Sequence, residues 1–410
     1  MTVSPHKAEV DRQLEIIRTR TEELIPAAEW LAKLERSIAT KTPLRVKQGF
    51  DPTAPDIHLG HTLGLRKLRQ FQELGHQVVL IVGSYTALVG DPSGRSATRP
   101  PLTEDQVMAN AQTYMEQFFK VVDRDRTEVH WNGDWFKKMS FVDILKLASQ
   151  VTVARILERD DFEKRYNASQ PISLHEFFYP LMQGFDSVAI KADIEVGGTD
   201  QKFNLLMGRN LQREYAQESQ IAVITPLLEG TDGVQKMSKS LGNYIGINEP
   251  PQEIFGKVMS ISDELMWRYH ELCTDLSVSQ ITSLRESTKN GERNPRDVKA
   301  DLAKRIVADF YSHGEAHKAE DEFNAMFRNK QAPDSVEEKA LPSGMWKLPK
   351  LLVELGMVSS MAEARRMIEQ GGVYVEGERR TQSDFEVDLS NDHSLLIQVG
   401  KRRFVRVKGE

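Results

Sequence analysis

The stretch LRVKQGFDPTAPDIHLGHTLGLRKLRQFQELGHQVVLIVG, from Leu44 to Gly83, contains the pattern that decides the fold. Leu44–Asp51 is typical of a short strand leading into a loop, and the helical segment after the loop places Leu65, Leu68 and Phe71 on one face. HQVVLIVG, His76–Gly83, has the continuous apolar run of a strand buried on both faces. Strand, helix and strand in this order predict a βαβ unit with parallel strands and a right-handed crossover.

The neighbouring segments extend this unit into a larger sheet. Residues 1–40 are expected to be helical, with Leu14, Ile17 and Leu24 on one buried face. Thr103 and Gln106 form a predicted capping box at the start of a further helix. ADIEVGG (192–198) and QIAVITPLL (220–228) supply more strands, so we expect an α/β fold with a Rossmann-like, doubly wound parallel sheet over roughly residues 40–245.

Beyond the sheet, the sequence changes character twice. Residues 250–332 are helical in pattern, and the polar, proline-bearing stretch 329–344 has the composition of a linker. A helical segment over 348–372 then leads into short alternating strands at 373–377, 394–400 and 402–409. We therefore predict an α/β domain with an N-terminal helical segment, an α-helical domain, a linker and a small α+β domain, over 1–245, 246–330, 331–345 and 346–410.

Composition is that of an ordinary globular protein. The 410 residues, 40% hydrophobic and 28% charged, suffice for two or three domains. No apolar stretch approaches the roughly 18 residues of a membrane span, and the N-terminus lacks the apolar core of a secretory signal, so we expect a cytoplasmic protein without membrane contact. Cys273 is the only cysteine, which excludes a disulfide framework and a structural zinc cluster. With a net charge of −6, any contact with RNA needs a local basic patch.

Two histidines, His58 and His61, follow the first predicted strand, and three interpretations compete for them. A metal site is one, although metal-binding histidines usually stand four residues apart with further ligands nearby. A structural role at a helix entry is the second. The third is a nucleotide site, because open α/β sheets bind ligands at the turn after a parallel strand, where helix N–H groups attract phosphate. Gly60 would let a flat base or ribose lie against the helix backbone.

DGVQKMSKSLGN, Asp232–Asn243, favours the nucleotide interpretation. It places Lys236 and Lys239 on a glycine-flanked loop beyond a later strand, where two ammonium groups could neutralise a leaving pyrophosphate. The alternative is a solvated lysine loop. His-Leu-Gly-His and Lys-Met-Ser-Lys-Ser are hard to obtain together by chance, so the pair indicates the class of protein.

With these motifs the chain resembles a class I aminoacyl-tRNA synthetase. GDPSGRSATRP, YPLMQGFD and GGTDQ stand between them in the order and spacing of bacterial tyrosyl-tRNA synthetases, and the resemblance covers nearly the whole chain. It implies a ligase that activates L-tyrosine with ATP and Mg²⁺, releases pyrophosphate, and transfers tyrosine from tyrosyl-adenylate to the 3′ end of tRNA(Tyr). It also implies a homodimer, a catalytic α/β domain, a helical domain that contacts tRNA, and no tightly bound protein-ligated metal.

The same resemblance assigns roles on the nucleotide side of the site. His58, His61 and Thr53 match phosphate-contacting positions, and Lys236 and Lys239 match the loop lysines that hold the leaving pyrophosphate. Asp200 matches the ribose ligand. Further ATP-binding positions are Gly49, Asp51, Gly60 and Gly198, together with Arg95 and Arg99, which otherwise belong to a solvated loop.

Five residues match tyrosine-binding positions. Asp91, Tyr179 and Gln183 would hold the substrate ammonium, Asp186 would accept a hydrogen bond from the phenol hydroxyl, and Gln201 would steady the reacting carboxylate. One position departs from the pattern, because many family members place a tyrosine two residues before the glycine of GFD and this chain has Lys47. The sequence leaves the remaining recognition of the phenol open.

The C-terminal segment SSMAEARRMIEQGGVYVEGERR (359–380) resembles a small RNA-binding fold found in a ribosomal protein and in bacterial tyrosyl-tRNA synthetases. The last ten residues hold five basic residues and one acidic residue, a local positive patch that phosphates would attract. The expected tRNA-binding residues, whose alternative role is a solvated surface, are Arg365, Arg366, Lys401, Arg402, Arg403 and Arg406.

Two rival functions share parts of this pattern. A tryptophanyl-type synthetase has the same fold, but Asp186 and the C-terminal module argue against it. A non-catalytic RNA-binding protein on this scaffold would not need both intact motifs.

Overall fold

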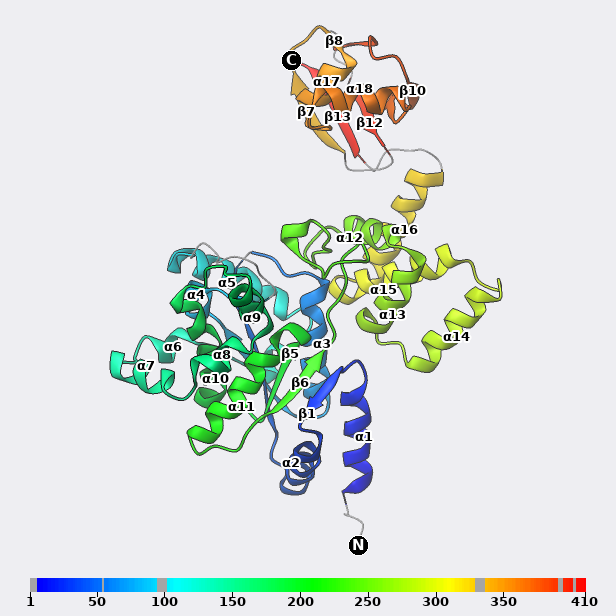
Figure 1. Ribbon diagram of the computed structural model, residues 1–410. Helices are drawn as coiled ribbons and strands as arrows, with labels where there is room; N and C mark the ends of the chain where they lie inside the picture. The colour runs from blue at the N-terminus through cyan, green and yellow to red at the C-terminus, as the bar shows by residue number, and fades with distance from the viewer. Residues whose placement is uncertain (1–5, 54, 94–101, 329–335, 390–393, 401–402) are drawn as a thin grey trace. The chain divides into compact units, whose positions relative to one another are not determined.

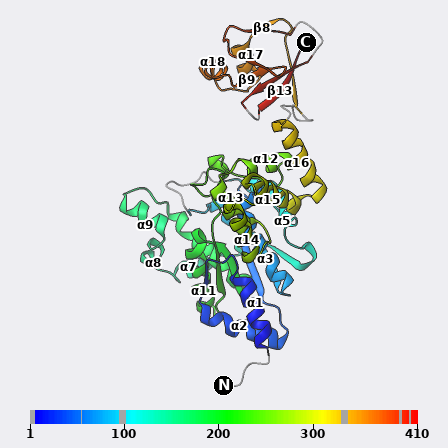
Figure 2. The same ribbon diagram turned by 90° about the vertical axis from the view of Figure 1, so that its right-hand side faces the viewer.

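The computed structural model describes residues 6–53, 55–93, 102–328, 336–389, 394–400 and 403–410. The chain divides into two compact units, Met1–Ser312 and His313–Glu410, each taken by itself below (Figures 1 and 2). Within the described residues, no helix is both long and apolar enough to cross a lipid bilayer.

The first unit is built on a six-stranded sheet. Its strands in spatial order are β1 (Glu23–Ile25), β6 (Ile221–Thr225), β5 (Ile194–Gly198), β2 (Arg45–Phe50), β3 (Gln77–Val82) and β4 (Thr127–Trp131). The strands from β6 to β4 run parallel and β1 pairs antiparallel with β6, which confirms the α/β fold with its doubly wound sheet. The predicted βαβ unit consists of β2, α3 (Leu59–Glu73) and β3, and Leu65, Leu68 and Phe71 are fully buried.

Residues 1–40 are not continuously helical, so that expectation was wrong. Helices α1 (Lys7–Arg18) and α2 (Ala27–Thr40) are separated by β1, because Glu23–Ile25 pairs with the open edge of the sheet at β6. Pro26 then stands at the N-cap of α2, where its missing N–H costs nothing. Strand β4 was not predicted, since its five half-buried residues at the other edge carry no continuous apolar run.

Short helices fill the connections of the sheet. The Thr103–Gln106 capping box is confirmed, since the Thr103 N–H donates to Gln106 Oε1 at 3.0 Å and the Gln106 N–H donates to Thr103 Oγ1 at 3.3 Å. The helices are α4 (Thr86–Val89), α5 (Glu104–Phe118), α6 (Gly133–Phe136), α7 (Phe141–Ala148), α8 (Val153–Leu157), α9 (Asp160–Asn167), α10 (Phe178–Ile190) and α11 (Lys202–Glu214). The 3₁₀ turns are η1 (Arg124–Arg126), η2 (Leu174–Phe177), η3 (Thr199–Gln201) and η4 (Lys239–Leu241).

Helices continue after the sheet, as the sequence pattern predicted. They are α12 (Pro251–Ser260), α13 (Asp263–Cys273), α14 (Val278–Lys289) and α15 (Pro295–Phe310), drawn in yellow-green in Figure 1. Arg66 on α3 donates to Asp275 at 3.0 Å and also pairs with Asp309 on α15. The helix that begins at HLGH is therefore tied directly to this helical group.

The second unit begins with α16 (His313–Arg328) and contains a small α+β core. Its five-stranded sheet has the order β10 (Glu378–Arg380), β9 (Val373–Val375), β12 (Leu395–Val399), β13 (Arg403–Gly409) and β7 (Glu337–Leu341), and β8 (Met345–Lys347) pairs with β11 (Glu386–Asp388). The helical segment predicted over 348–372 is two helices, α17 (Leu348–Glu354) and α18 (Met361–Glu369). They are separated because Gly356 has a positive φ of 70° and the Ser360 side chain caps α18.

Part of the segment predicted as a linker is ordered secondary structure. Glu337–Leu341 forms β7, which pairs in parallel with β13. Its polar composition is that of a linker, but an edge strand is held by backbone hydrogen bonds to its neighbour and tolerates exposed polar side chains. Residues 329–335 lie outside the described residues.

Candidate active site

His58 and His61 lie at the start of α3, with His58 as its N-cap residue. The imidazole rings stack with centroids 3.9 Å apart, and the His58 backbone N–H donates to His61 Nδ1 at 3.2 Å. On either side of His58, the Leu59 N–H donates to the Ile245 carbonyl at 3.0 Å and the Ile247 N–H donates to the Ile57 carbonyl at 3.2 Å. These bonds hold HLGH against the chain that follows the KMSKS loop.

Gly60 is needed for this close packing. A Cβ at this position would lie 3.1 Å from the His58 ring and 3.6 Å from Met237 Cβ, in the middle of KMSKS. The two motifs, about 180 residues apart in the chain, therefore lie next to each other at Gly60.

The two KMSKS lysines face acidic groups of the site. Lys236 Nζ lies 3.0 Å from Asp200 Oδ2, and Lys239 Nζ lies 3.9 Å from Asp56 Oδ2. The loop is closed by Asn243, which accepts from the Ser238 N–H at 2.8 Å and donates to Asp232 at 2.7 Å. Asn243 was not singled out from the sequence, although it belongs to the quoted motif.

Burial is the largest cause that lowers the pKa of both histidines, followed at His58 by the neighbouring His61, and the charges of Lys239 and Lys236 lower the pKa of both further. The pKa of His58 falls to about 2 and that of His61 to about 4. Both imidazoles are therefore neutral at pH 7. They can donate hydrogen bonds to a phosphate, while the positive charge at this place comes from Lys236 and Lys239.

This electrostatic arrangement predicts a loss of stability in mild acid. The unfolded chain takes up a proton on His58 below its ordinary pKa of 6.5, whereas the folded chain does not until about pH 2. The free energy of unfolding should therefore fall as the pH drops below about 6.5, by ~1.4 kcal/mol for this one histidine at pH 5.5. Urea unfolding at pH 7.5 and 5.5 measures it. His58→Gln should abolish the part of this pH-dependent loss of stability that His58 causes. His175→Gln, at an exposed position on η2, should leave the loss of stability between pH 7.5 and 5.5 unchanged.

Asp91 is the centre of a polar cluster on the tyrosine side. Its carboxylate accepts from the Ser93 N–H at 2.9 Å, from Gln201 Nε2 at 2.8 Å and from Arg159 Nη2 at 3.1 Å. Burial alone would raise the pKa of Asp91, but the Arg159 charge and these hydrogen bonds lower it overall, so the group is ionised. Arg159 is buried, also bonds Asp161 at 2.8 Å, and was missed because no local pattern links it to Asp91.

Gln183 on α10 joins the same cluster through Asn204, and Tyr179 on the same helix lies close enough to Asp91 for that carboxylate to raise its pKa. Tyr179 donates to Asp51 Oδ2 at 2.9 Å, and burial raises its pKa well above the ordinary value, so it stays a neutral donor. Asn204 Nδ2 donates to Gln183 Oε1 at 2.8 Å and to Gln201 Oε1 at 2.9 Å. Asn204 is a second residue that sequence reasoning missed.

Asp186 on α10 and Lys47 on β2 are both buried. Asp186 accepts from Trp135 Nε1 at 3.0 Å and from Asn132 Nδ2 at 3.4 Å, and burial raises its pKa to about 7. Lys47 lies 3.2 Å from Glu195 Oε1, and each of these two side chains is only 1% exposed. The residue that departs from the family pattern is thus half of a buried ion pair.

Comparison with known proteins decides the class. Residues 39–328 match the family model of the class I tRNA synthetases for tryptophan and tyrosine, and residues 346–393 match the S4 domain. The chain belongs to this synthetase family. It is 53% identical to the tyrosine–tRNA ligase of Moorella thermoacetica over 97% of this chain and 96% of that one, and 54% identical to that of Carboxydothermus hydrogenoformans over 97% and 98%.

Solved structures agree on the synthetase fold. A tyrosyl-tRNA synthetase from Archaeoglobus fulgidus in complex with L-tyrosine has a TM-score of 0.60, 23% identity, and covers 76% of this chain and 99% of that one. A C-terminally truncated mitochondrial tyrosyl-tRNA synthetase from Aspergillus nidulans has a TM-score of 0.63, 22% identity, and covers 78% and 94%.

Several other residues expected in the synthetase site can be placed. The Thr53 N–H donates to the Asp51 carbonyl at 2.8 Å, next to the Asp51 side chain that Tyr179 contacts. A Cβ on Gly198 would lie 2.8 Å from Asp200 Oδ1, so glycine permits a close approach there. A Cβ on Gly49 would make only an ordinary contact of 3.9 Å with Ile81. Arg95 and Arg99 lie outside the described residues.

Four of the synthetase's predicted tRNA-binding residues lie on two described elements, α18 and β13. Arg366 and Arg403 both lie close enough to Glu363 to lower its pKa. Arg406 alternates along β13 with the buried Val405 and Val407, so its side chain leaves the opposite face of the strand. Arg365 is exposed on α18, and Lys401 and Arg402 are outside the described residues.

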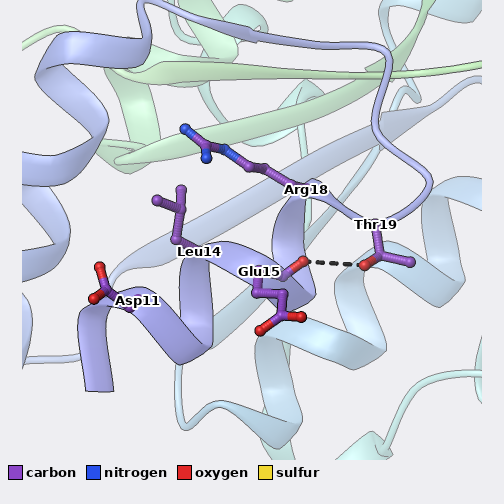
Figure 3. A pocket seen from close by; sticks show the side chains of 5 residues that line it. All are labelled: Asp11, Leu14, Glu15, Arg18 and Thr19. Atoms are coloured by element: carbon purple, nitrogen blue, oxygen red, sulfur yellow. Dashed lines mark hydrogen bonds between the residues drawn. The ribbon is translucent and has the colours of Figure 1, made fainter. Parts of the chain in front are cut away.

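An open surface hollow lies away from the synthetase motifs. It is lined by Asp11, Leu14, Glu15, Arg18 and Thr19, all on α1 or at its C-cap (Figure 3). Thr19 Oγ1 donates to the Glu15 carbonyl at 3.0 Å across one edge (Figure 3). It contains none of the residues assigned to the site. Within the described ranges, no group of three or more His, Cys, Asp or Glu side chains is arranged to hold a metal ion.

Proposed function

We propose that this chain is a tyrosine–tRNA ligase that forms tyrosyl-adenylate from L-tyrosine and Mg²⁺-bound ATP and then transfers tyrosine to tRNA(Tyr). The observation that carries the proposal is that HLGH and KMSKS lie next to each other at Gly60, while Lys236 pairs with Asp200, the residue before Gln201 of the cluster around Asp91. Relatives named tyrosine–tRNA ligase share about half of the sequence over nearly the full chain.

The chemistry needs positioning and charge more than proton transfer. The tyrosine carboxylate is already ionised and attacks the α-phosphate, so catalysis consists of holding the reactants and stabilising charge on the leaving pyrophosphate. Asp91, Tyr179 and Gln183 would hold the ammonium, Asp186 the phenol, and Gln201 the carboxylate. His58, His61 and Thr53 would donate to the phosphates, while Lys236 and Lys239 neutralise the pyrophosphate.

Lys236 and Asp200, to which we assign the pyrophosphate and the ribose of ATP, form an ion pair with each other. Asp200 is the proposed ribose ligand, and Lys236 holds it at 3.0 Å in the structure. Binding of ATP would exchange this partner, freeing the Lys236 ammonium for phosphate and the carboxylate for the ribose hydroxyls.

The test is amino-acid-dependent ATP–pyrophosphate exchange with magnesium, comparing tyrosine, phenylalanine and tryptophan. Exchange with tyrosine alone is expected. Exchange with tryptophan would change the substrate and keep the mechanism, whereas folded protein without exchange for any of the three would contradict adenylation.

Several finer expectations belong to the same proposal. The S4 match at residues 346–393 supports tRNA binding by the C-terminal segment. The divisions at 245/246 and 330/331 remain our proposal for the domains, whereas the pairing of β7 with β13 moves the start of the C-terminal domain from 346 back to Glu337. The cytoplasm, where a buried free thiol such as Cys273 stays reduced, remains the proposed location.

A homodimer is also proposed, supported by an exposed apolar surface on α7 and α8. Phe141 is 75% exposed, Leu145 54% and Val153 63%. Both helices pack through Leu147 and Ile156 onto one buried cluster, so these exposed side chains lie over the same part of the unit. Large apolar side chains gathered in this way are typical of a protein interface.

Phe141→Asp combined with Leu145→Asp should convert the dimer to a monomer, because two carboxylates would have to be buried in the interface. Light scattering during size-exclusion chromatography measures the mass. Val278→Asp, on an equally exposed valine of α14, is the matched control and should leave the mass unchanged. An unaltered dimer in the double variant would place the interface elsewhere.

A further inference from the structure

Lys47 and Glu195 form an ion pair in the interior of the sheet. They are direct neighbours on the parallel strands β2 and β5, with Nζ and Oε1 3.2 Å apart. Each side chain is 1% exposed. Removing two charges from water is costly unless further hydrogen bonds satisfy both groups.

Three further bonds of this pair lead to α10 on the tyrosine side of the site, and one leads to Gln220 before β6. Lys47 Nζ donates to the Gln183 carbonyl at 3.1 Å, and Glu195 Oε1 accepts from Gln183 Nε2 at 3.2 Å. Glu195 Oε2 accepts from Ser187 Oγ at 3.2 Å and from Gln220 Nε2. Gln183 and Ser187 belong to α10, the helix that also carries Tyr179 and Asp186.

Asp186 lies within the electrostatic reach of the pair. The groups that face it are Lys47 on β2, Glu195 on β5, Asn132 after β4 and Trp135 on α6. Burial raises the pKa of Asp186, the Lys47 charge opposes that rise, and Glu195 adds a smaller contribution in the raising direction. An ionised carboxylate is a stronger acceptor for a phenol O–H than a protonated one.

We propose that Lys47, paired with Glu195, is a positioning and specificity-determining residue for the phenol end of the substrate. Its ammonium donates to the Gln183 carbonyl on α10 and supplies a positive charge that favours the ionised form of Asp186. Lys47 therefore acts through Asp186 and Gln183, where many family members offer a tyrosine hydroxyl. The inference rests on the proposed tyrosine–tRNA ligase function.

The experiment compares the neutral double variant Lys47→Met/Glu195→Gln with the wild type. The single variant Lys47→Met leaves Glu195 buried without its partner and is prone to misfold, whereas the double variant removes both charges. Lys33→Met is the matched control, since Lys33 is also 1% exposed and ion-paired, but with Asp193, at the amino end of β5. Pyrophosphate exchange is measured with tyrosine and with phenylalanine between pH 5.5 and 9.

For the double variant, the KM for tyrosine should rise ~10-fold and the preference in kcat/KM for tyrosine over phenylalanine should fall ~10-fold or more, because the phenol acceptor is weakened. The acid limb of kcat/KM for tyrosine should move to higher pH, because Asp186 loses the charge that favours its ionised form. The KM for ATP of the double variant should stay at the wild-type value. In Lys33→Met, the preference for tyrosine over phenylalanine and the acid limb of kcat/KM for tyrosine should both stay at wild-type values.

A folded double variant with wild-type discrimination and an unmoved acid limb would overturn the inference. So would the same changes in Lys33→Met, since they would then reflect the loss of any buried lysine. Absence of tyrosine-dependent exchange in the wild type would instead overturn the proposed function itself, so the two failures are distinguishable.

Discussion

Replacing Lys239 with alanine is expected to lower tyrosine-dependent pyrophosphate exchange by ~100- to 1000-fold while tyrosine still binds. The Lys239 ammonium lies 3.9 Å from Asp56 and close enough to both HLGH histidines to lower their pKa values. Because those imidazoles are neutral, they cannot replace the lost positive charge where the pyrophosphate leaves. Exchange kinetics and equilibrium dialysis with labelled tyrosine separate the two effects.

Lys164→Ala is the control for this prediction. Lys164 is an exposed lysine on α9 that pairs with Asp160 at 2.6 Å, and its removal should change neither measurement. Unchanged exchange in Lys239→Ala would count heavily against the assignment of the loop. An equal loss in His58→Ala that zinc restores would bring back the metal interpretation of HLGH.

Asp91→Asn is expected to raise the KM for tyrosine by ~100-fold or more, with little change in the KM for ATP. Asp91 supplies the formal negative charge of the proposed ammonium site, and its neighbours Gln201 and Arg159 are donors. With asparagine in its place, the substrate ammonium would be buried beside the Arg159 guanidinium without a compensating charge. Steady-state exchange kinetics with varied tyrosine measures the effect.

Asp161→Asn provides a matched comparison, because Asp161 bonds the same Arg159 at 2.8 Å on its Nε. It removes one acidic partner of Arg159 while Asp91 is kept. Only a small change in the KM for tyrosine is expected. An increase as large as that of Asp91→Asn would mean that both variants act through Arg159 and that Asp91 does not bind the ammonium directly.

Local sequence pattern was sufficient to predict the strand and helices that carry the site. The apolar run of β3, the helical face of α3 and the capping box at Thr103 were all predicted, because each depends on neighbours within a few residues. The edge strands β1 and β7 were not, because their short segments are held by backbone pairing with β6 and β13. The sequence alone does not reveal which edge is open.

By itself the sequence determined the class of protein, since HLGH and KMSKS are short motifs whose residue types and order are sufficient to recognise it. Only the tertiary structure decided which partners position the residues of the site. Arg159 reaches Asp91 from 68 positions away, and Asn204 joins Gln183 to Gln201. Lys47 and Glu195 meet because the register of β2 and β5 places them side by side. Such pairings depend on burial and on strand register, which are properties of the folded sheet and leave no local pattern in the chain.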